Sequence, residues 1–154
     1  MSALDAISKD HRMIAKRIQL LEEASLSILR KRISGGEDSN PVEEFLKFFR
    51  IGVMQHFKIE ETALFPVLQD VFKDKEPQIL ELLSEHKRIM DKYLSLHNAE
   101  SSKEARTERL INLLNDLSAH ARKEESLLPP LVKMLNEKQL KRIDEAARKL
   151  RYPV

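Results

Sequence analysis

The chain has 154 residues, of which 42% are hydrophobic and 34% charged, with only three glycines and a net charge of +2 at pH 7. A chain of this length forms one domain with a single core, and the shortage of glycine favours long helices over sheets. The absence of cysteine excludes disulfides, thiolate metal sites and cysteine catalysis, and it is compatible with a reducing cytoplasm. No apolar run has the length of a signal peptide or a membrane span, so we expect a cytoplasmic chain without membrane contact.

Apolar residues recur at helical spacing in four long segments, and no strand pattern competes with them. Breaks such as "SGGEDSN" and "NAESSKE" separate these segments, and a weaker amphipathic segment follows the fourth. The predicted helices span about residues 3–33, 41–72, 77–98, 102–135 and 137–150. Short connections between long helices imply antiparallel neighbours. The sequence therefore predicts an all-α, up-down-up-down four-helix bundle with a short C-terminal fifth helix, all in one domain.

Polar residues mark the expected starts of three of these helices. Asn40, which is followed by proline, is suited to cap the second helix. Ser101 and Glu104 have the spacing of a capping box before the fourth helix, and Asn136 and Gln139 have the same spacing before the fifth.

The last segment, "EKQLKRIDEAARKLRY", is richer in basic residues than the rest of the chain, although acidic residues interrupt them. We interpret it as the solvated face of a helix and not as a nucleic-acid-binding surface. Its apolar residues recur at helical spacing and are expected to dock on the bundle of the same chain: Leu140, Ile143, Ala147 and Leu150.

The two halves of the chain resemble each other. "HFKIEETALFPVL" aligns with "HARKEESLLPPLV" at His, both Glu, Leu and Pro, and "DHRMIAK" resembles "EHKRIMD". The sequence thus predicts two related helical hairpins, one from His11 to Pro66 and one from His86 to Pro130. A proline inside a helix costs about 3 kcal/mol, so both prolines are expected to bend or end their helices.

Each long helix carries one histidine on its apolar stripe. In the second and fourth helices a glutamate follows the histidine by four residues, which puts both side chains on one face about 6 Å apart. The inward-facing polar residues are thus His11, His56, Glu60, His86, His120 and Glu124. Alone, such a histidine is usually a hydrogen-bonded core residue, and such a pair usually stabilises an exposed helix face.

The six residues together do not fit that purely structural interpretation. Burying two carboxylates near each other without counter-charge costs several kcal/mol per ion. Four neutral imidazoles supply no positive charge, whereas two divalent cations neutralise the acids and accept the imidazole lone pairs. The sequence therefore predicts a dinuclear metal centre, and nitrogen and oxygen donors without sulfur suit iron, manganese or zinc.

The order of the motifs separates this chain from two other classes of metal protein. Ferritin-like di-iron bundles place Glu three residues before His, whereas here the order is His-x-x-x-Glu. The HExxH motif of zinc peptidases is missing. In order along the four helices, "DHRMI", "HFKIEETALFP", "EHKRI" and "HARKEESLLPPL" resemble the hemerythrin family, specifically its HHE cation-binding branch. The resemblance covers nearly the whole chain and leaves only the last helix unassigned.

This resemblance implies a non-heme di-iron centre inside a four-helix bundle. Two iron ions with an oxo or hydroxo bridge are the expected cofactor, with manganese or zinc as substitutes. Carried over position by position, the resemblance implies that His11 and His56 bind one iron and that His86 and His120 bind the other. It also implies that Glu60 and Glu124 bridge the two irons.

Two positions depart from the oxygen-carrying members of the family. Those members have a fifth histidine one turn after the histidine of the third helix, where this chain has Met90, a poor ligand for ferric iron and a common core filler. Their fourth-helix acid lies five residues after its histidine, where this chain has Glu125. The HHE pattern favours Glu124, so Glu124 is the expected ligand and Glu125 its rival.

The sequence gives weaker evidence that other polar residues belong to the metal site. His97 lies eleven residues after His86, about 16 Å further along the helix, and is expected near a helix end. Tyr93 either reaches the site or only packs, and Leu117 and Phe49 are expected to wall the metal pocket. Four acids either accept the free N–H of a ligand histidine or form surface ion pairs: Asp10, Glu61, Glu85 and Glu125.

The resemblance implies that the centre binds or senses dioxygen or another small diatomic molecule. A second hypothesis is a di-iron redox enzyme that reduces peroxide or nitric oxide, or donates iron for iron–sulfur repair. Repair-type relatives usually carry a cysteine-bearing N-terminal module, and this chain has no cysteine. A third hypothesis is a metal-gated interaction module, whose last helix contacts a protein partner that the sequence does not identify.

Overall fold

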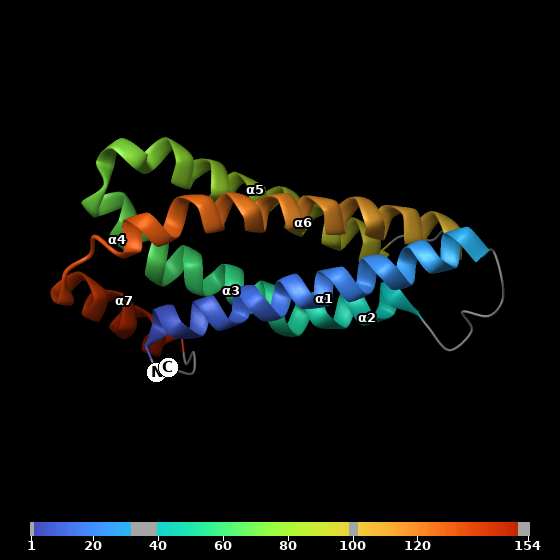
Figure 1. Ribbon diagram of the computed structural model, residues 1–154, viewed down its shortest axis with the longest axis horizontal. Helices are drawn as coiled ribbons and strands as arrows, with labels where there is room; N and C mark the ends of the chain where they lie inside the picture. The colour runs from blue at the N-terminus through green and yellow to red at the C-terminus, as the bar shows by residue number, and fades with distance from the viewer. Residues whose placement is uncertain (1, 32–39, 99–101, 151–154) are drawn as a thin grey trace.

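The computed structural model describes residues 2–31, 40–98 and 102–150, and this part of the chain is almost entirely helical (Figure 1). Four long helical stretches run antiparallel along the molecule: α1 (Ala3–Lys31), α2 through α4 (Pro41–Val71), α5 (Glu76–Asn98) and α6 (Lys103–Val132). A shorter helix, α7 (Glu137–Lys149), lies at the end of the bundle where α1 begins. The predicted all-α bundle with a fifth helix is confirmed. Within the described residues, no helix combines the length and apolarity that a membrane span requires.

The second bundle helix is continuous but not uniform. Its parts are α2 (Pro41–Phe48), η2 (Phe49–Val53), α3 (Met54–Ile59), η3 (Glu60–Leu64) and α4 (Phe65–Val71), and the short turn η4 (Lys73–Lys75) follows it. In the π-helical turns η2 and η3, the N–H groups of Met54 and Phe65 donate to carbonyls five residues back, those of Phe49 and Glu60. Each π turn adds one residue, which rotates the residues after it by about 100°. The helix segment α3, which carries His56, is bracketed by these two turns.

The two prolines of the repeat have different effects on the backbone. Pro66 is the second residue after η3, and the chain continues as a helix to Val71. In a regular α-helix the ring of Pro66 would press against the carbonyl of Thr62, and the wider π turn relieves this clash. Pro130 lies in the last turn of α6, which ends at Val132, three residues before the predicted end at 135. Neither Pro129 nor Pro130 has an N–H to donate, so the last turn of α6 is weakly hydrogen-bonded.

Side-chain caps define where three of the helices begin. The Asn40 side chain accepts a hydrogen bond from the backbone N–H of Glu43 at 3.3 Å, as predicted. The capping box between Asn136 and Gln139 is also confirmed, with both bonds at 2.9 Å. The prediction for α6 was wrong by one residue. Its N-cap is Ser102, whose hydroxyl accepts from the N–H three residues later, and Ser101 lies outside the described residues.

Apolar side chains form two buried clusters, one on each side of the polar residues along the bundle. On α1, Ile7 belongs to the first cluster and Ile14 to the second, with His11 between them. On α6, Leu128 and Leu117 flank the segment with the polar residues in the same order. Because each cluster packs side chains from all four bundle helices, the polar segment between them is held on both sides by a close-packed core.

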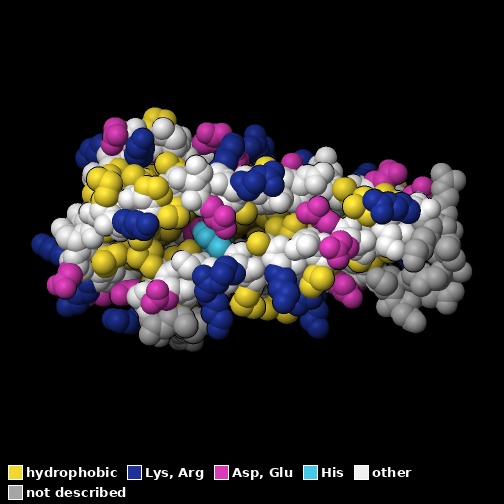
Figure 2. All heavy atoms as spheres, viewed as in Figure 1, with side chains coloured by type: hydrophobic (Ala, Val, Ile, Leu, Met, Phe, Trp, Pro, Cys, Tyr) yellow, Lys and Arg dark blue, Asp and Glu magenta, His cyan; other side chains and the backbone are white. Residues whose placement is uncertain are grey.

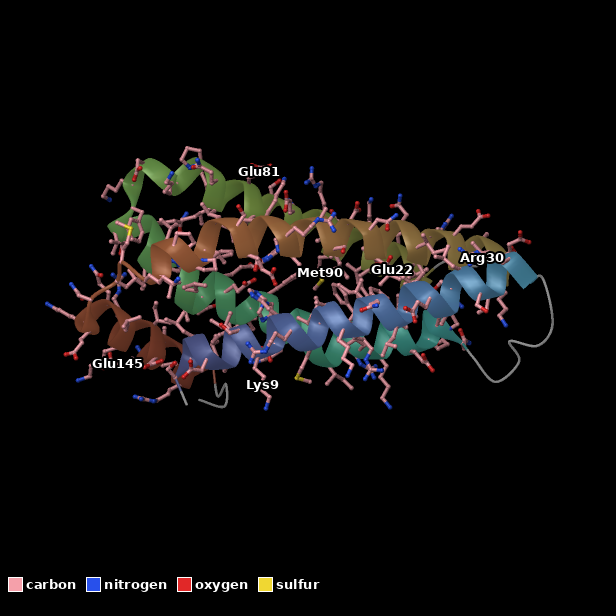
Figure 3. The ribbon with its side chains drawn as sticks, viewed as in Figure 1. Lys9, Glu22, Arg30, Glu81, Met90 and Glu145 are labelled. Carbon is pink, nitrogen blue, oxygen red and sulfur yellow. The ribbon has the colours of Figure 1, made fainter. Side chains whose placement is uncertain are left out.

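The helix α7 completes the first of these clusters. Ile143 and Ala147 are fully buried in it, and Asp144 accepts a hydrogen bond from the backbone N–H of Ala3 at 2.8 Å. Figure 3 shows that Glu145 points away from the bundle. The apolar face of α7 is therefore covered by its own chain, as the sequence predicts.

Candidate metal centre

Each of the four bundle helices contributes one histidine to a polar centre between the two apolar clusters. The histidines of α3, α5 and α6 have side chains only 3–5% exposed, whereas the imidazole of His11 on α1 is 19% exposed. The carboxylates of Glu60 and Glu124 are 0% and 2% exposed. Figure 2 shows a histidine side chain at the surface near the middle of the face that α1 and α6 form, with acidic side chains beside it. All six residues singled out from the sequence thus meet in one place: His11, His56, Glu60, His86, His120 and Glu124.

The six side chains form two groups of four that share their carboxylates. In the first group, Glu60 Oε2 lies 3.2 Å from His11 Nε2 and 3.3 Å from His56 Nε2. The other carboxylate, Glu124, places its Oε2 atom 3.0 Å from His11 Nε2. The donor atoms of these four residues all lie within 4.8 Å of one another, which is compact enough for one cation.

The second group uses the other oxygen of each carboxylate. His86 Nε2 lies 3.3 Å from Glu60 Oε1 and 3.3 Å from Glu124 Oε1. The imidazole of His120 lies closer, with its Nε2 atom 2.6 Å from Glu124 Oε1. Each glutamate therefore directs one oxygen at the α1–α3 pair of histidines and the second oxygen at the α5–α6 pair. This is the arrangement that two bridging carboxylates require.

The electrostatics of the metal-free centre favour positive charge. Burial lowers the pKa of His11, but the carboxylates of Glu124 and Glu60 outweigh it and raise the pKa to about 10. Burial likewise opposes the increase for His56 and His86, whose neighbouring carboxylates raise their pKa values to about 9 and about 11. Burial would raise the pKa of Glu60, but the adjacent histidines hold it well below its usual range. Without metal, protonated histidines balance the charge of the two carboxylates, and divalent cations that displace these protons would take over that role.

Several buried atoms of the centre lack a hydrogen-bond partner. Within the described part of the chain, His56 Nε2, His120 Nε2 and Glu60 Oε1 make no hydrogen bond, although each lies close to another group of the centre. Buried polar atoms are nearly always satisfied, so unpaired ones need an explanation. Imidazole nitrogens and carboxylate oxygens are common metal ligands, and the compact groups that these residues form would fit a cation.

Three of the imidazoles are oriented from behind by a carboxylate. His56 Nδ1 lies 3.3 Å from Asp10 Oδ2, His86 Nδ1 lies 2.8 Å from Glu61 Oε2, and His120 Nδ1 lies 2.7 Å from Glu85 Oε1. An Nδ1–H that donates to a carboxylate leaves the lone pair on Nε2, the nitrogen that faces the centre. The sequence analysis left open whether these three acids support histidines or form surface ion pairs. In the structure each lies within hydrogen-bond distance of an inward-facing imidazole, and Glu85 also forms an ion pair with Lys123.

Two residues that the sequence analysis considered as alternative site residues, Glu125 and His97, lie outside the two groups of potential ligands. Glu125 is exposed and belongs to neither group of potential ligands, whereas Glu124 belongs to both. His97 is also exposed, and its Nδ1 atom lies 3.4 Å from the side-chain oxygen of the adjacent Asn98. Glu125 lies off the stripe that faces the bundle axis, since it follows the inward-facing Glu124 directly. His97 lies on nearly the same face as His86 but eleven residues further along, near the end of α5 at Asn98, which is too far to reach the centre.

Aromatic side chains cover the α5–α6 side of the centre. The ring of Phe57 stacks on His86 with centroids 3.8 Å apart and planes 10° apart, and it meets His120 edge-on at 5.7 Å. Phe49 packs on Phe57 at 6.2 Å, and Tyr93 stacks on Phe49 at 4.3 Å. Tyr93 therefore packs in the core, and Phe49 supports the wall from behind. The direct wall, Phe57, was missed by the sequence analysis, although its place next to His56 was a visible clue.

Comparison with known proteins agrees with this geometry. A family model described as the hemerythrin HHE cation-binding domain matches residues 2–150, a span that includes α7. No curated protein and no solved structure matches the chain significantly. A family defined by cation binding accounts for the buried histidines, the shared carboxylates and their unpaired atoms. The chain belongs to the hemerythrin family, as a metal-binding protein whose residues 2–150 match the HHE cation-binding domain.

Proposed function

We propose that the chain is a non-heme di-iron protein that binds or senses dioxygen or another small diatomic molecule. The proposed ligands are His11, His56, Glu60, His86, His120 and Glu124. The observation that carries the proposal is that each buried glutamate directs one oxygen at each of two histidine pairs. Such a donor set suits two cations, and iron is the metal that the family suggests, with manganese or zinc as substitutes.

Two iron ions with an oxo or hydroxo bridge would supply redox chemistry and coordination of a diatomic ligand. The residues of the chain would hold and orient these ions and limit the access of water to them. Glu60 and Glu124 balance the charge of the cations, while the carboxylates behind the imidazoles fix the orientation of the rings. Phe57 limits the access of water to His86 and His120, and the flanking apolar clusters hold the donors in place.

A small apolar cavity supports a route for such a ligand. It has a volume of about 190 Å³ and reaches His11 and Glu124, and Glu125 and Lys133 also line it. The aliphatic part of its wall consists of Leu4, Ile7, Leu64, Leu128 and Val132. Dioxygen and nitric oxide are small and weakly polar, so an aliphatic path favours them over charged solutes. The cavity meets the centre on its more exposed side, at His11.

A di-iron redox enzyme is the second candidate function. Met90 stands where oxygen carriers have a further histidine, and it lines the same surface pocket as His86. An extra open position on a metal favours reduction of peroxide or nitric oxide over reversible binding. The metal-gated module gains no support, because the apolar face of α7 is buried against its own bundle.

Metal analysis combined with rapid mixing tests this proposal. Protein produced with ample iron should contain about two irons per chain, and His120→Ala should lower that content or alter its spectrum. His97→Ala is the matched control and should leave both unchanged. A reversible spectral change of the reduced protein with dioxygen supports binding, whereas multiple turnovers with peroxide or nitric oxide support the enzyme. An iron content near one per chain would contradict the dinuclear centre.

A further inference from the structure

The two histidine pairs differ in how firmly their rings are held. In the α5–α6 pair, both Nδ1 atoms have close carboxylate partners, at 2.8 Å for His86 and 2.7 Å for His120. In the α1–α3 pair, the bond from His56 to Asp10 is longer, at 3.3 Å. In the described part of the chain, the carboxylates within ion-pair distance of His11 are Glu60 and Glu124, and both approach its Nε2 atom.

The carboxylate behind His120 is itself fixed more firmly than the other two. Glu85 is only 7% exposed, and it accepts a hydrogen bond from the ammonium group of Lys123, which also contacts Glu81. Asp10 and Glu61 are 31% and 45% exposed and have no comparable cation in the described residues. Burial strengthens charge-assisted hydrogen bonds, so the Lys123–Glu85–His120 chain orients its imidazole best.

Access of solvent also differs between the two sides. The imidazole of His11 is 19% exposed and borders the aliphatic cavity. His86 and His120 each border a surface pocket, but their side chains are only 3% and 5% exposed beneath the ring of Phe57. A cation leaves a site when water or a competing ligand reaches it and its protein ligands turn away. Both steps are easier on the α1–α3 side.

We propose that the two metal positions are unequal: the His86–His120 position holds its metal tightly, and the His11–His56 position exchanges it. The inference rests on the dinuclear centre proposed above. It assigns Glu85, Glu61 and Asp10 as positioning residues, the first two acting on the tight position and the third on the exchangeable one. The exchangeable position is the one whose histidine, His11, borders the aliphatic cavity.

Release of ferrous iron to a chelator tests the proposal. Protein loaded with iron and reduced is mixed without oxygen with an excess of a chelator that forms a coloured ferrous complex, and colour is followed over time. Wild type should release its iron in a fast and a slow phase of equal size. Asp10→Asn should accelerate only the fast phase and Glu85→Gln only the slow phase, each by roughly tenfold, the loss expected when an outer partner of a ligand histidine is removed.

Two controls separate positioning from general destabilisation. Glu81→Gln removes a carboxylate that contacts Lys123 but no imidazole, and it should leave both phases unchanged. Thermal unfolding of each metal-free variant gives the temperature range in which it is fully folded, and iron release is compared within that range, so that altered release reflects the metal positions themselves. A single phase for both irons, or a fast phase that Glu85→Gln accelerates, would overturn the ranking. Wild-type protein that binds no iron at all would instead contradict the di-iron function on which the ranking rests.

Discussion

Glu60 and Glu85 are both buried carboxylates, yet their neighbours give them different roles. Glu85 contacts the ammonium group of Lys123, which together with His120 lowers its pKa against the opposing effect of burial. Glu60 is fully buried, and in the described residues its ion-pair contacts are all histidines. A buried carboxylate without a lysine or arginine partner destabilises the fold unless another positive charge balances it, so Glu60 is the carboxylate expected to attract protons or a metal ion. Glu60 is accordingly a proposed ligand, whereas Glu85 positions one.

Glu124 and Glu125 provide a matched pair for testing the ligand assignment. Glu124→Gln replaces the buried shared carboxylate, and we expect a loss of iron affinity larger than the roughly 10–100-fold that removal of an outer partner causes. Glu125→Gln changes an exposed neighbour and should leave affinity within experimental error. Iron content after dialysis against a weak chelator measures both. Loss of iron in Glu125→Gln alone would show that the register of α6 at the centre is wrong.

Met90 is the residue at which this chain departs most from the oxygen carriers. Met90→His adds an imidazole one turn after His86 on α5, in the pocket that both residues line. Figure 3 shows Met90 within the outline of the bundle. A further nitrogen ligand would close an open coordination position, so the reduced variant should oxidise in air more slowly than the wild type. The spectral change of the reduced protein on exposure to air measures this, with Met134→His on the surface as control.

At the scale of elements, the second bundle helix shows how the backbone adapts to the site. The π turn η3 begins at Glu60, and η2 ends just before the segment that carries His56. Between the turns, α3 keeps regular spacing, so the side chains of His56 and Glu60 remain on one face. After η3 the helix rotates by about 100°, which is compatible with Phe65 lying beside His86 at 5.8 Å. π turns inside α-helices are frequent at functional sites.

The docking of α7 should contribute measurably to stability. Ile143 is 0% exposed inside the first apolar cluster, so Ile143→Ala should lower the free energy of unfolding by about 2–5 kcal/mol. Met134→Ala, at a side chain that is 69% exposed, is the control and should change stability by less than about 0.5 kcal/mol. Urea unfolding of the metal-free proteins measures both. Equal midpoints for Ile143→Ala and wild type would mean that α7 does not pack on the bundle in solution.

At the scale of the whole molecule, the centre couples folding to protons and metal. In the metal-free fold, the pKa values of His11, His56 and His86 are raised to about 10, 9 and 11. In the unfolded chain a histidine has a pKa of about 6.5. The stability that these three histidines add is therefore complete below that pH, and it is lost progressively as the pH rises through their pKa values in the folded protein. Metal-free protein should therefore become less stable between pH 6 and pH 10.

The iron-loaded protein should respond differently, because the metals replace the protons on the imidazoles. Its stability should vary less than that of the metal-free protein over the same range, and the difference between the two should grow as the pH rises. Urea midpoints at several pH values, with and without iron, measure this difference. Parallel curves for the two forms would show that the metal does not occupy the histidine cluster.

Much of the fold was readable from the sequence because local rules determine it. The helical spacing of apolar residues predicted four bundle helices, and the apolar residues of the last segment predicted that it docks. The cap at Asn40 was correct, whereas the cap of α6 was displaced by one residue because adjacent serines compete for that role. The π turns were not predicted, since they arise where tertiary packing rotates a helix that its sequence alone leaves regular.

The sequence by itself determined which residues converge. One inward-facing histidine on each bundle helix, and a glutamate four residues after two of them, placed six polar side chains on inward stripes, because helical periodicity assigns faces without knowledge of the partners. The tertiary structure decided which contacts each of these residues makes. Which carboxylate oxygen faces which pair, which acid holds which ring and which imidazole meets solvent all depend on distances between different helices. Asp10, Glu61 and Glu85 each support a histidine on another helix, and the spacing of residues along a single helix does not specify such contacts.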